Sequence, residues 1–302
     1  MNQKDNRILI GHLFALFCVT AWGTSFLVSQ HLMEKLMPAQ LMWLRFLIAY
    51  LAMWIICPRW RLSWKEDWQG LILSLIGNTL YFLAENTALR LSQASNVSIL
   101  VSTAPILSVF LTWIFHQGEK LSGTQLLGVG IAFVGVLLVV FNGVFILKLN
   151  PAGDLLAFAA AFCWAAYNLL AKRLLGQFDS ALLTRKLMFY GMLTSAPLLL
   201  NEGSLISELD SFSLLDVCGL LYLGLICSAL CYLLWNTAID SLGAVRTNLY
   251  VYFVPLVTLL ASALFLGEKI TGVGLIGIIL VILGMIMSSF ERGSRQTEHL
   301  PD

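Results

Sequence analysis

The chain has 302 residues and a formal net charge of +1; 59% of its residues are hydrophobic and 12% are charged. A soluble domain averages about 45–50% apolar and about 25% charged residues, so this apolar excess cannot be buried in one soluble core. A lipid bilayer is the solvent that accepts it, and the near-neutral charge without a basic run gives no indication of nucleic-acid binding.

Ten segments are apolar enough to cross a bilayer, which takes a helix of about 20 mostly apolar residues. In chain order they are residues 8–29, 38–56, 68–89, 94–115, 122–141, 151–171, 181–201, 214–238, 244–266 and 271–290. The connections are short and polar, and we expect the polar tail, residues 291–302, to be disordered. The sequence therefore predicts an all-α membrane protein with ten transmembrane helices.

The first apolar segment is preceded by Lys4 and Arg7, as in a signal peptide. It is longer than the apolar region of a signal peptide, and no cleavage site of the A-x-A type follows it. We therefore expect it to be retained as the first span.

The lysines and arginines predict the orientation, because these residues are enriched in loops on the cytoplasmic side. With the N-terminus inside, the inner segments would hold Lys4, Arg7, Arg59, Arg61, Lys65, Lys120, Lys172, Arg173, Arg246, Arg292 and Arg295. The outer loops would hold Lys35, Arg90, Lys148 and Lys269. This bias predicts a multi-pass protein of the bacterial inner membrane with both termini in the cytoplasm.

An internal repeat relates the two halves of the chain. The matching pairs are residues 86–88 (NTA) with 236–238 (NTA), Pro105 with Pro255, 118–123 (GEKLSG) with 267–272 (GEKITG), and Gly128 and Gly135 with Gly277 and Gly284. Composition alone does not produce this order of residues, so we interpret it as a duplication, with repeats at 1–145 and 146–290. Because each copy has five spans, the second must enter from the opposite side, which predicts the two inverted five-helix repeats common in secondary transporters.

The repeated glycines and prolines have mainly structural interpretations. Gly128 and Gly135 are seven residues apart, as are their partners in the second half, so each pair lies on one helix face where close packing is expected. Ser122 and Gln125 have the spacing of a capping box, and Glu119 beside them is interpreted as an anchor at a helix junction. Pro105 and its partner should kink their helices, and such a kink either borders a cavity or serves packing alone.

Among the charged residues of the predicted spans, two stand out because they lie away from the span ends; near the centre of a span a charge costs about 2.5–3.5 kcal/mol and needs a partner, water or a function. They are Arg45 and Glu85. At a rise of about 1.5 Å per residue, their depths below the outer surface differ by only about 5 Å. We hypothesise that they face each other in the outer half of the bundle. They would form either a buried ion pair that joins two helices or a charged site for substrate or a proton.

Polar and aromatic residues also gather in the interiors of particular spans. Together with Arg45 and Glu85, the predicted substrate-binding residues are Trp22, Ser25, Asn78, Tyr81, Asn96, Trp164, Asn168, Tyr232, Trp235, Asn248 and Tyr252. The fifth and tenth spans contribute almost none, so we expect them to pack at the periphery. A single aromatic residue in a span is more often an anchor or a packing residue. The collective pattern, however, predicts a weakly polar aromatic cavity suited to amino acids, aromatic metabolites or organic cations.

Several motifs together resemble one known family. They are residues 21–26 (AWGTSF), Arg45-Phe46, Ala88-Leu89 with Ala94-Ser95, Pro105, and Glu119 followed by Gly128 and Gly135. This set resembles the EamA-type branch of the drug/metabolite transporter superfamily. The resemblance implies ten helices, cytoplasmic termini, a central cavity between the halves, and transport of metabolites or drugs, commonly export of amino acids or related compounds.

The second half departs from the first at the charged positions. No arginine there matches Arg45, and Trp235 stands where Glu85 would be. The predicted site is therefore asymmetric, and the family pattern does not require an acid at Glu85, which leaves proton coupling open.

Other classes of function are disfavoured by the motifs. We find no nucleophile or metal-binding signature of an intramembrane enzyme and no nucleotide-binding loop of a primary pump, so no enzymatic activity, cofactor or metal is expected. The predicted function is secondary transport of small metabolites, in the export direction, by alternating access. A receptor or scaffold without flux and a passive facilitator are the alternatives, and the sequence gives no oligomeric state.

Overall fold

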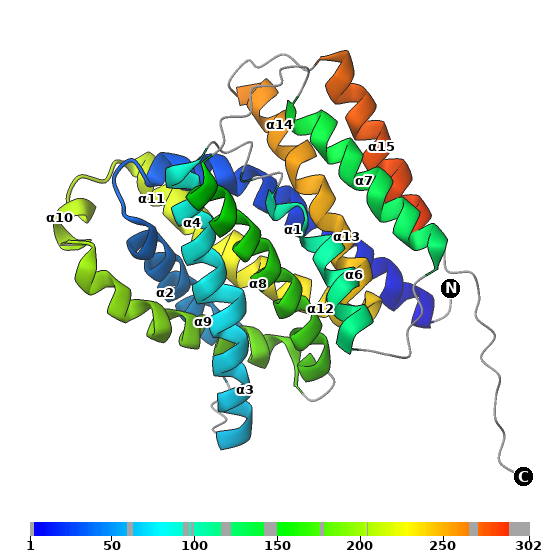
Figure 1. Ribbon diagram of the computed structural model, residues 1–302. Coiled ribbons are helices and arrows are strands. Elements are labelled where there is room, and N and C mark those ends of the chain that lie inside the picture. Colours follow the sequence, from blue (N-terminus) through cyan, green and yellow to red (C-terminus); the bar gives the residue numbers. More distant parts are fainter. Residues whose placement is uncertain are drawn as a thin grey trace, which may run out of the picture.

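The computed structural model describes residues 3–58, 63–92, 97, 100–115, 122–141, 150–175, 178–203, 205–265 and 271–289. Throughout this described part the regular elements are helices, and none of its residues forms a strand, as the sequence predicts. The tail at 291–302, the Gly-Glu-Lys turns and the predicted site residue Asn96 lie outside the described residues. Figure 1 shows the helices as one bundle coloured along the chain.

The helices follow one another closely along the chain. In the first half they are α1 (Gln3–Leu32), α2 (Pro38–Ile56), α3 (Trp64–Ser74), η1 (Leu75–Leu80), α4 (Tyr81–Leu91), α6 (Ala104–Phe115) and α7 (Gly123–Phe141). In the second half they are α8 (Pro151–Leu175), α9 (Ser180–Ser195), η2 (Ala196–Asn201), α10 (Leu205–Leu209), α11 (Leu214–Leu221), η3 (Tyr222–Leu230), α12 (Cys231–Leu242), α13 (Ala244–Leu249), η4 (Tyr250–Tyr252), α14 (Phe253–Phe265) and α15 (Gly272–Ser289).

Several of these stretches have the length and composition to cross a bilayer. Within the described residues six qualify: Asp5–Leu32, Pro38–Ile56, Gly123–Phe141, Pro151–Leu175, Leu214–Leu242 and Ala244–Ala261. Two shorter apolar helices, Ala104–Phe115 and Gly272–Ser288, lie at two further predicted spans. Large side chains on these helices are exposed, for example Leu264 and Ile279, which is expected of surfaces that face lipid.

Local sequence sets several helix boundaries. Pro38 is the first residue of α2, where its missing N–H is not needed. The backbone N–H of Ser122 donates to Gln125 Oε1 at 2.9 Å, and the N–H of Gln125 donates to Ser122 Oγ at 3.2 Å. This reciprocal pair confirms the predicted capping box before α7. At the end of α12, Gly243 has a φ of 88°, which a residue with a side chain rarely adopts.

Two helices contain long π-helical stretches at matching places. The stretch η1 runs directly into α4, and η3 runs directly into α12. Shifted by the 150 positions that separate the repeated NTA motifs, η1 falls within η3. A π-helical turn holds an extra residue and rotates the face that follows, and such turns are frequent at functional sites. The rotated helices α4 and α12 are two of those that carry site residues.

The helices of the two halves pack on each other reciprocally. Helix α1 packs on α12 and α14, and its counterpart α8 packs on α4 and α6. Helix α2 packs on α9, and α7 packs on α15. Exchanging each helix for its counterpart in the other half leaves these pairings unchanged.

An extensive contact between the halves joins α7 and α15, which lie side by side at one edge of the bundle (Figure 1). A Cβ atom added to Gly128 would lie 2.6 Å from the carbonyl oxygen of Gly284, and one added to Gly135 would lie 2.7 Å from that of Gly277. The start of one helix therefore meets the end of the other, so the two run antiparallel. The glycines do lie on the closely packed face that their spacing predicts.

Candidate functional site

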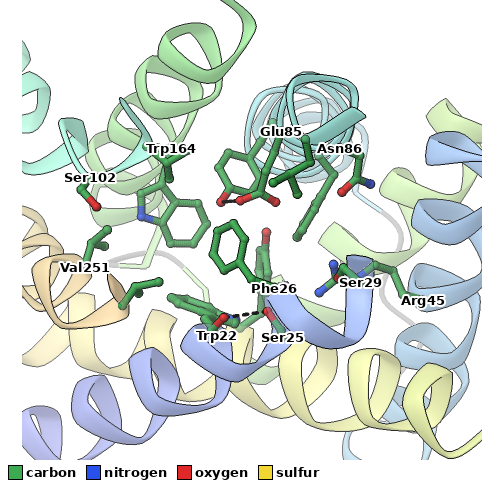
Figure 2. A pocket seen from close by; sticks show the side chains of 16 residues that line it. Trp22, Ser25, Phe26, Ser29, Arg45, Glu85, Asn86, Ser102, Trp164 and Val251 are labelled. Carbon is green, nitrogen blue, oxygen red and sulfur yellow. Dashed lines mark hydrogen bonds between the residues drawn. The ribbon is translucent and has the colours of Figure 1, made fainter. Parts of the chain in front are cut away.

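A pocket lies among helices from both halves and holds about 710 Å³ of space between side chains, its open side included. Most of its lining comes from α1 and α4, with single residues from α2, α8 and α12. Figure 2 shows Trp22 and Glu85 on opposite sides, Trp164 and Val251 toward one end, and Arg45 toward the other. Arg45 and Glu85, the two charged residues predicted from the sequence, thus line one pocket.

Helix α1 presents one face to the pocket. Trp22, Ser25, Phe26 and Ser29 line it, with the three- and four-residue spacing of a single helical face. The indole N–H of Trp22 donates to the carbonyl oxygen of Cys227 at 2.9 Å, which fixes the ring against η3. Ser25 donates to the carbonyl oxygen of Trp22 at 2.8 Å.

Helix α4 supplies the acid of the pocket. Its lining residues Tyr81, Phe82, Glu85, Asn86 and Leu89 again lie on one helical face. The hydroxyl of Tyr81 donates to Glu85 Oε1 at 2.7 Å, one helical turn away. The other carboxylate oxygen of Glu85 has no hydrogen-bond donor among the described residues.

Helix α2 supplies the positively charged residue of the pocket, Arg45. The guanidinium Nε of Arg45 donates to Ser228 Oγ at 2.9 Å, and its Cζ lies 4.2 Å from the centroid of the Phe82 ring. A guanidinium over an aromatic face is a cation–π contact, which is stronger when water is excluded. Within the described part of the chain, Arg45 and Glu85 form no ion pair with each other. The two charges share a pocket, but each is held by other groups.

An aromatic cluster, defined here as Trp22, Trp164, Tyr167, Tyr232 and Trp235, lies at one side of the pocket, and its members Trp22, Trp164 and Tyr232 form an aromatic wall of the pocket. The ring centroids of Trp22 and Trp164 lie 5.2 Å apart in an edge-to-face arrangement, and those of Trp22 and Trp235 lie 4.9 Å apart. Trp235 is fully buried behind this wall, and its indole N–H donates to Asn168 Oδ1 at 2.8 Å. Asn168 in turn donates to the carbonyl oxygen of Trp164 at 2.7 Å. Trp235 and Asn168 therefore support the wall without lining the pocket.

Three other predicted residues join helices away from the pocket. Asn78 donates to the carbonyl oxygen of Leu187 at 2.9 Å, which links η1 to α9. Asn248 donates to Ser108 Oγ at 2.5 Å, and the Tyr252 hydroxyl donates to the carbonyl oxygen of Val129 at 3.4 Å. Their chemistry matches that of the lining residues, but their side chains point toward neighbouring helices.

The two prolines mark interruptions that border the pocket. Pro105 is the second residue of α6 and follows a turn, while Pro255 follows the short helix η4 at the start of α14. Ser102, beside the first interruption, and Val251, within the second, line the pocket. The kinks predicted at the prolines are thus breaks in the helix just before each proline, and they do border a cavity.

Some lining residues were missed by sequence reasoning. They are Phe26, Ser29, Phe82, Asn86, Leu89, Val101, Ser102, Val251 and Val254. A usable signal existed for those on α1 and α4, because they complete helical faces already marked by Trp22 and by Glu85. No such signal marks the valines, since valine is common throughout the spans.

Comparison with known proteins identifies the class of protein to which the chain belongs. The model of the EamA-like transporter family matches residues 9–141 and again residues 151–290. The chain belongs to this family. It is therefore a multi-pass membrane protein and a transporter rather than an enzyme.

Individual relatives match over nearly the whole chain. An uncharacterized transporter of Archaeoglobus fulgidus is 30% identical over 97% of this chain and 99% of its own length. A protein of Escherichia coli named "Probable amino-acid metabolite efflux pump" is 28% identical over 96% of both chains. A solved crystal structure, 18% identical in sequence, superposes with a TM-score of 0.77 over 95% of this chain and 98% of that chain, which shows a shared fold.

Proposed function

We propose that this protein is a secondary transporter that exports small metabolites, amino acids or related compounds and also drug-like molecules, across the bacterial inner membrane by alternating access. The observation that carries the proposal is the pocket, which both halves line and which combines two charged groups with an aromatic wall. Ligand sites of this kind are concave and mostly apolar, with a few polar groups that fix orientation.

Alternating access is supported by the symmetry of the contacts. Helix α1 packs on α12 and α14 just as its counterpart α8 packs on α4 and α6, and α7 packs antiparallel on α15. Two inverted repeats would produce such contacts. We therefore propose ten spans in two inverted repeats, 1–145 and 146–290, with both termini in the cytoplasm. Two halves related in this way can exchange roles and so open the pocket to either side.

In this proposed orientation the pocket would lie toward the outer side of the membrane, and we propose that it opens to the outside. The lining residues Ser29 and Leu89 lie toward the outer ends of α1 and α4. At the inner ends, Asp240 of α12 pairs with Arg7 of α1, and Lys172 of α8 donates to the carbonyl oxygen of Asp240 at 2.8 Å. The pair of Arg7 and Asp240 joins the two halves, and Lys172 holds Asp240 from within the second half. The contact between the halves would have to break for the pocket to open inward.

Export is the direction suggested by the relatives that are named efflux pumps. The test is release of labelled amino acids from loaded cells that produce the protein, compared with cells that lack it. Faster release, reduced when the transmembrane pH gradient is abolished, is the result expected of proton-coupled export. Faster release that ignores the gradient would support a passive facilitator, and saturable binding without release would support a receptor.

A further inference from the structure

Two opposite charges line one mostly apolar pocket and, in the described part of the chain, form no ion pair with each other. The exposed fractions of Arg45 and Glu85 are only 3% and 7%. A buried charge without a full set of partners is costly, and this cost is relieved when a ligand supplies the missing partner. The unused hydrogen-bonding capacity of each group therefore indicates what the ligand carries.

Arg45 has donors to spare. A guanidinium carries five N–H donors, and in the described part of the chain only its Nε–H has a hydrogen-bond acceptor, Ser228 Oγ. The other four N–H donors are on the two terminal nitrogens of the guanidinium, and the Arg45 side chain lines the pocket. Such a planar pair of donors matches the two oxygens of a carboxylate.

Glu85 has acceptors to spare. A carboxylate can accept about four hydrogen bonds, and the one donor to Glu85 in the described part of the chain is the hydroxyl of Tyr81. Its second oxygen is available to a cation in the pocket. An ammonium group supplies three donors and a full positive charge.

Much of the remaining lining is aromatic or aliphatic, although Ser25, Ser29, Asn86 and Ser102 also line the pocket. In Figure 2, Phe26 lies within the pocket, and Trp164 and Val251 lie toward the end away from Arg45. A ligand whose charged groups occupy the Arg45 and Glu85 region would place its remaining atoms against these aromatic and aliphatic side chains.

We infer that the pocket recognises zwitterions with an apolar side chain, its carboxylate bound by Arg45 and its ammonium by Glu85. This inference rests on the proposed transport function and specifies the substrate for it. A ligand with both charges satisfies both residues. A ligand that lacks either charge leaves one buried group unpaired and is disfavoured.

The test uses purified protein in proteoliposomes and labelled L-leucine, L-methionine and L-phenylalanine. Competitors are the amides of these amino acids, which lack the carboxylate, and their N-acetyl derivatives, which lack the ammonium. In the wild-type protein each free amino acid should compete at least about tenfold better than either derivative. Equal competition by all three forms, or transport of the derivatives but not of the amino acids, would overturn the inference while leaving transport established.

Two variants separate the roles of the charges. Glu85→Gln should abolish the preference for the amino acid over its N-acetyl derivative and keep the preference over its amide. Arg45→Gln should do the reverse. An equal loss for all three forms in both variants would assign the residues to folding and overturn the inference.

Matched controls are available outside the pocket. Asp216 and Lys186 are also buried charges, held by Lys35 at 2.7 Å and by Asp67 at 2.5 Å respectively. Asp216→Asn and Lys186→Gln should leave both preference ratios unchanged, even where they lower the yield of folded protein. If no amino acid or derivative crosses the membrane with folded wild-type protein, the amino-acid transport in the proposed function is overturned, and the inference with it.

Discussion

Asn168 shows how a polar residue inside a membrane helix can serve a site that it does not touch. Its side chain accepts a hydrogen bond from Trp235 and donates one to the carbonyl oxygen of Trp164. Both tryptophans contact Trp22, which lines the pocket. The amide therefore holds the aromatic wall in place from behind.

Replacing Asn168 with alanine tests this supporting role. The indole N–H of Trp235 would be left buried without an acceptor, which costs about 1–3 kcal/mol. We expect Asn168→Ala to lower the thermal unfolding temperature in detergent for this reason. Unchanged stability of Asn168→Ala would contradict the assignment.

The sequence predicted which kinds of side chain line the pocket better than it predicted which particular residues do so. Trp22, Tyr81 and Glu85 stand out because polar and aromatic groups are costly or conspicuous in apolar spans. Asn78 and Asn248 carry the same signal but face other helices, where they form interhelical hydrogen bonds. Spans that are apolar all round do not reveal which face points inward, so this distinction requires the packed structure.

At the scale of elements, the contact between α7 and α15 depends on the absence of side chains. The backbones of these helices approach so closely at Gly128 and Gly135 that any Cβ would collide with a carbonyl oxygen. Small residues allow this approach, and in a bilayer such close packing is a main source of helix association. The seven-residue spacing of the glycines made this packing predictable.

Two glycines on α7 give a matched comparison. Gly135→Ala should destabilise the protein by at least about 1–3 kcal/mol, because the added methyl overpacks the contact with Gly277. Gly130→Ala meets nothing within 4 Å and should be neutral or should stabilise the helix by about 0.5–1 kcal/mol. Thermal unfolding in one detergent measures both. Equal effects of the two substitutions would contradict the packing described for this interface.

Helix interruptions were harder to predict than helices. Pro105 and Pro255 pointed to irregular backbone in the fourth and ninth predicted spans, and the breaks lie directly before them. The π-helical stretches η1 and η3 carry no proline and follow from packing that the sequence alone does not show. They matter because each one turns the helix that follows it, and thereby sets which residues of α4 and α12 face the pocket.

At the scale of the whole molecule, symmetry and asymmetry have separate roles. The pairings of helices are reciprocal between the halves, which suits a protein that opens alternately to two sides. The pocket is not symmetric, because Glu85 lies in it while its repeat counterpart Trp235 is buried behind the wall. A shared scaffold thus carries one oriented set of charges, which permits recognition of a ligand with two different ends.

The most direct test of this account is transport by the purified protein in proteoliposomes, measured with a mixed pool of labelled amino acids. The account predicts saturable flux in the wild-type protein and at least about a tenfold loss of flux in Glu85→Gln, although the variant reconstitutes and unfolds like the wild type. Glu85 lines the pocket, so this loss would place the transport path there. Equal flux in the variant, or no flux of any compound by the folded wild-type protein, would contradict the account.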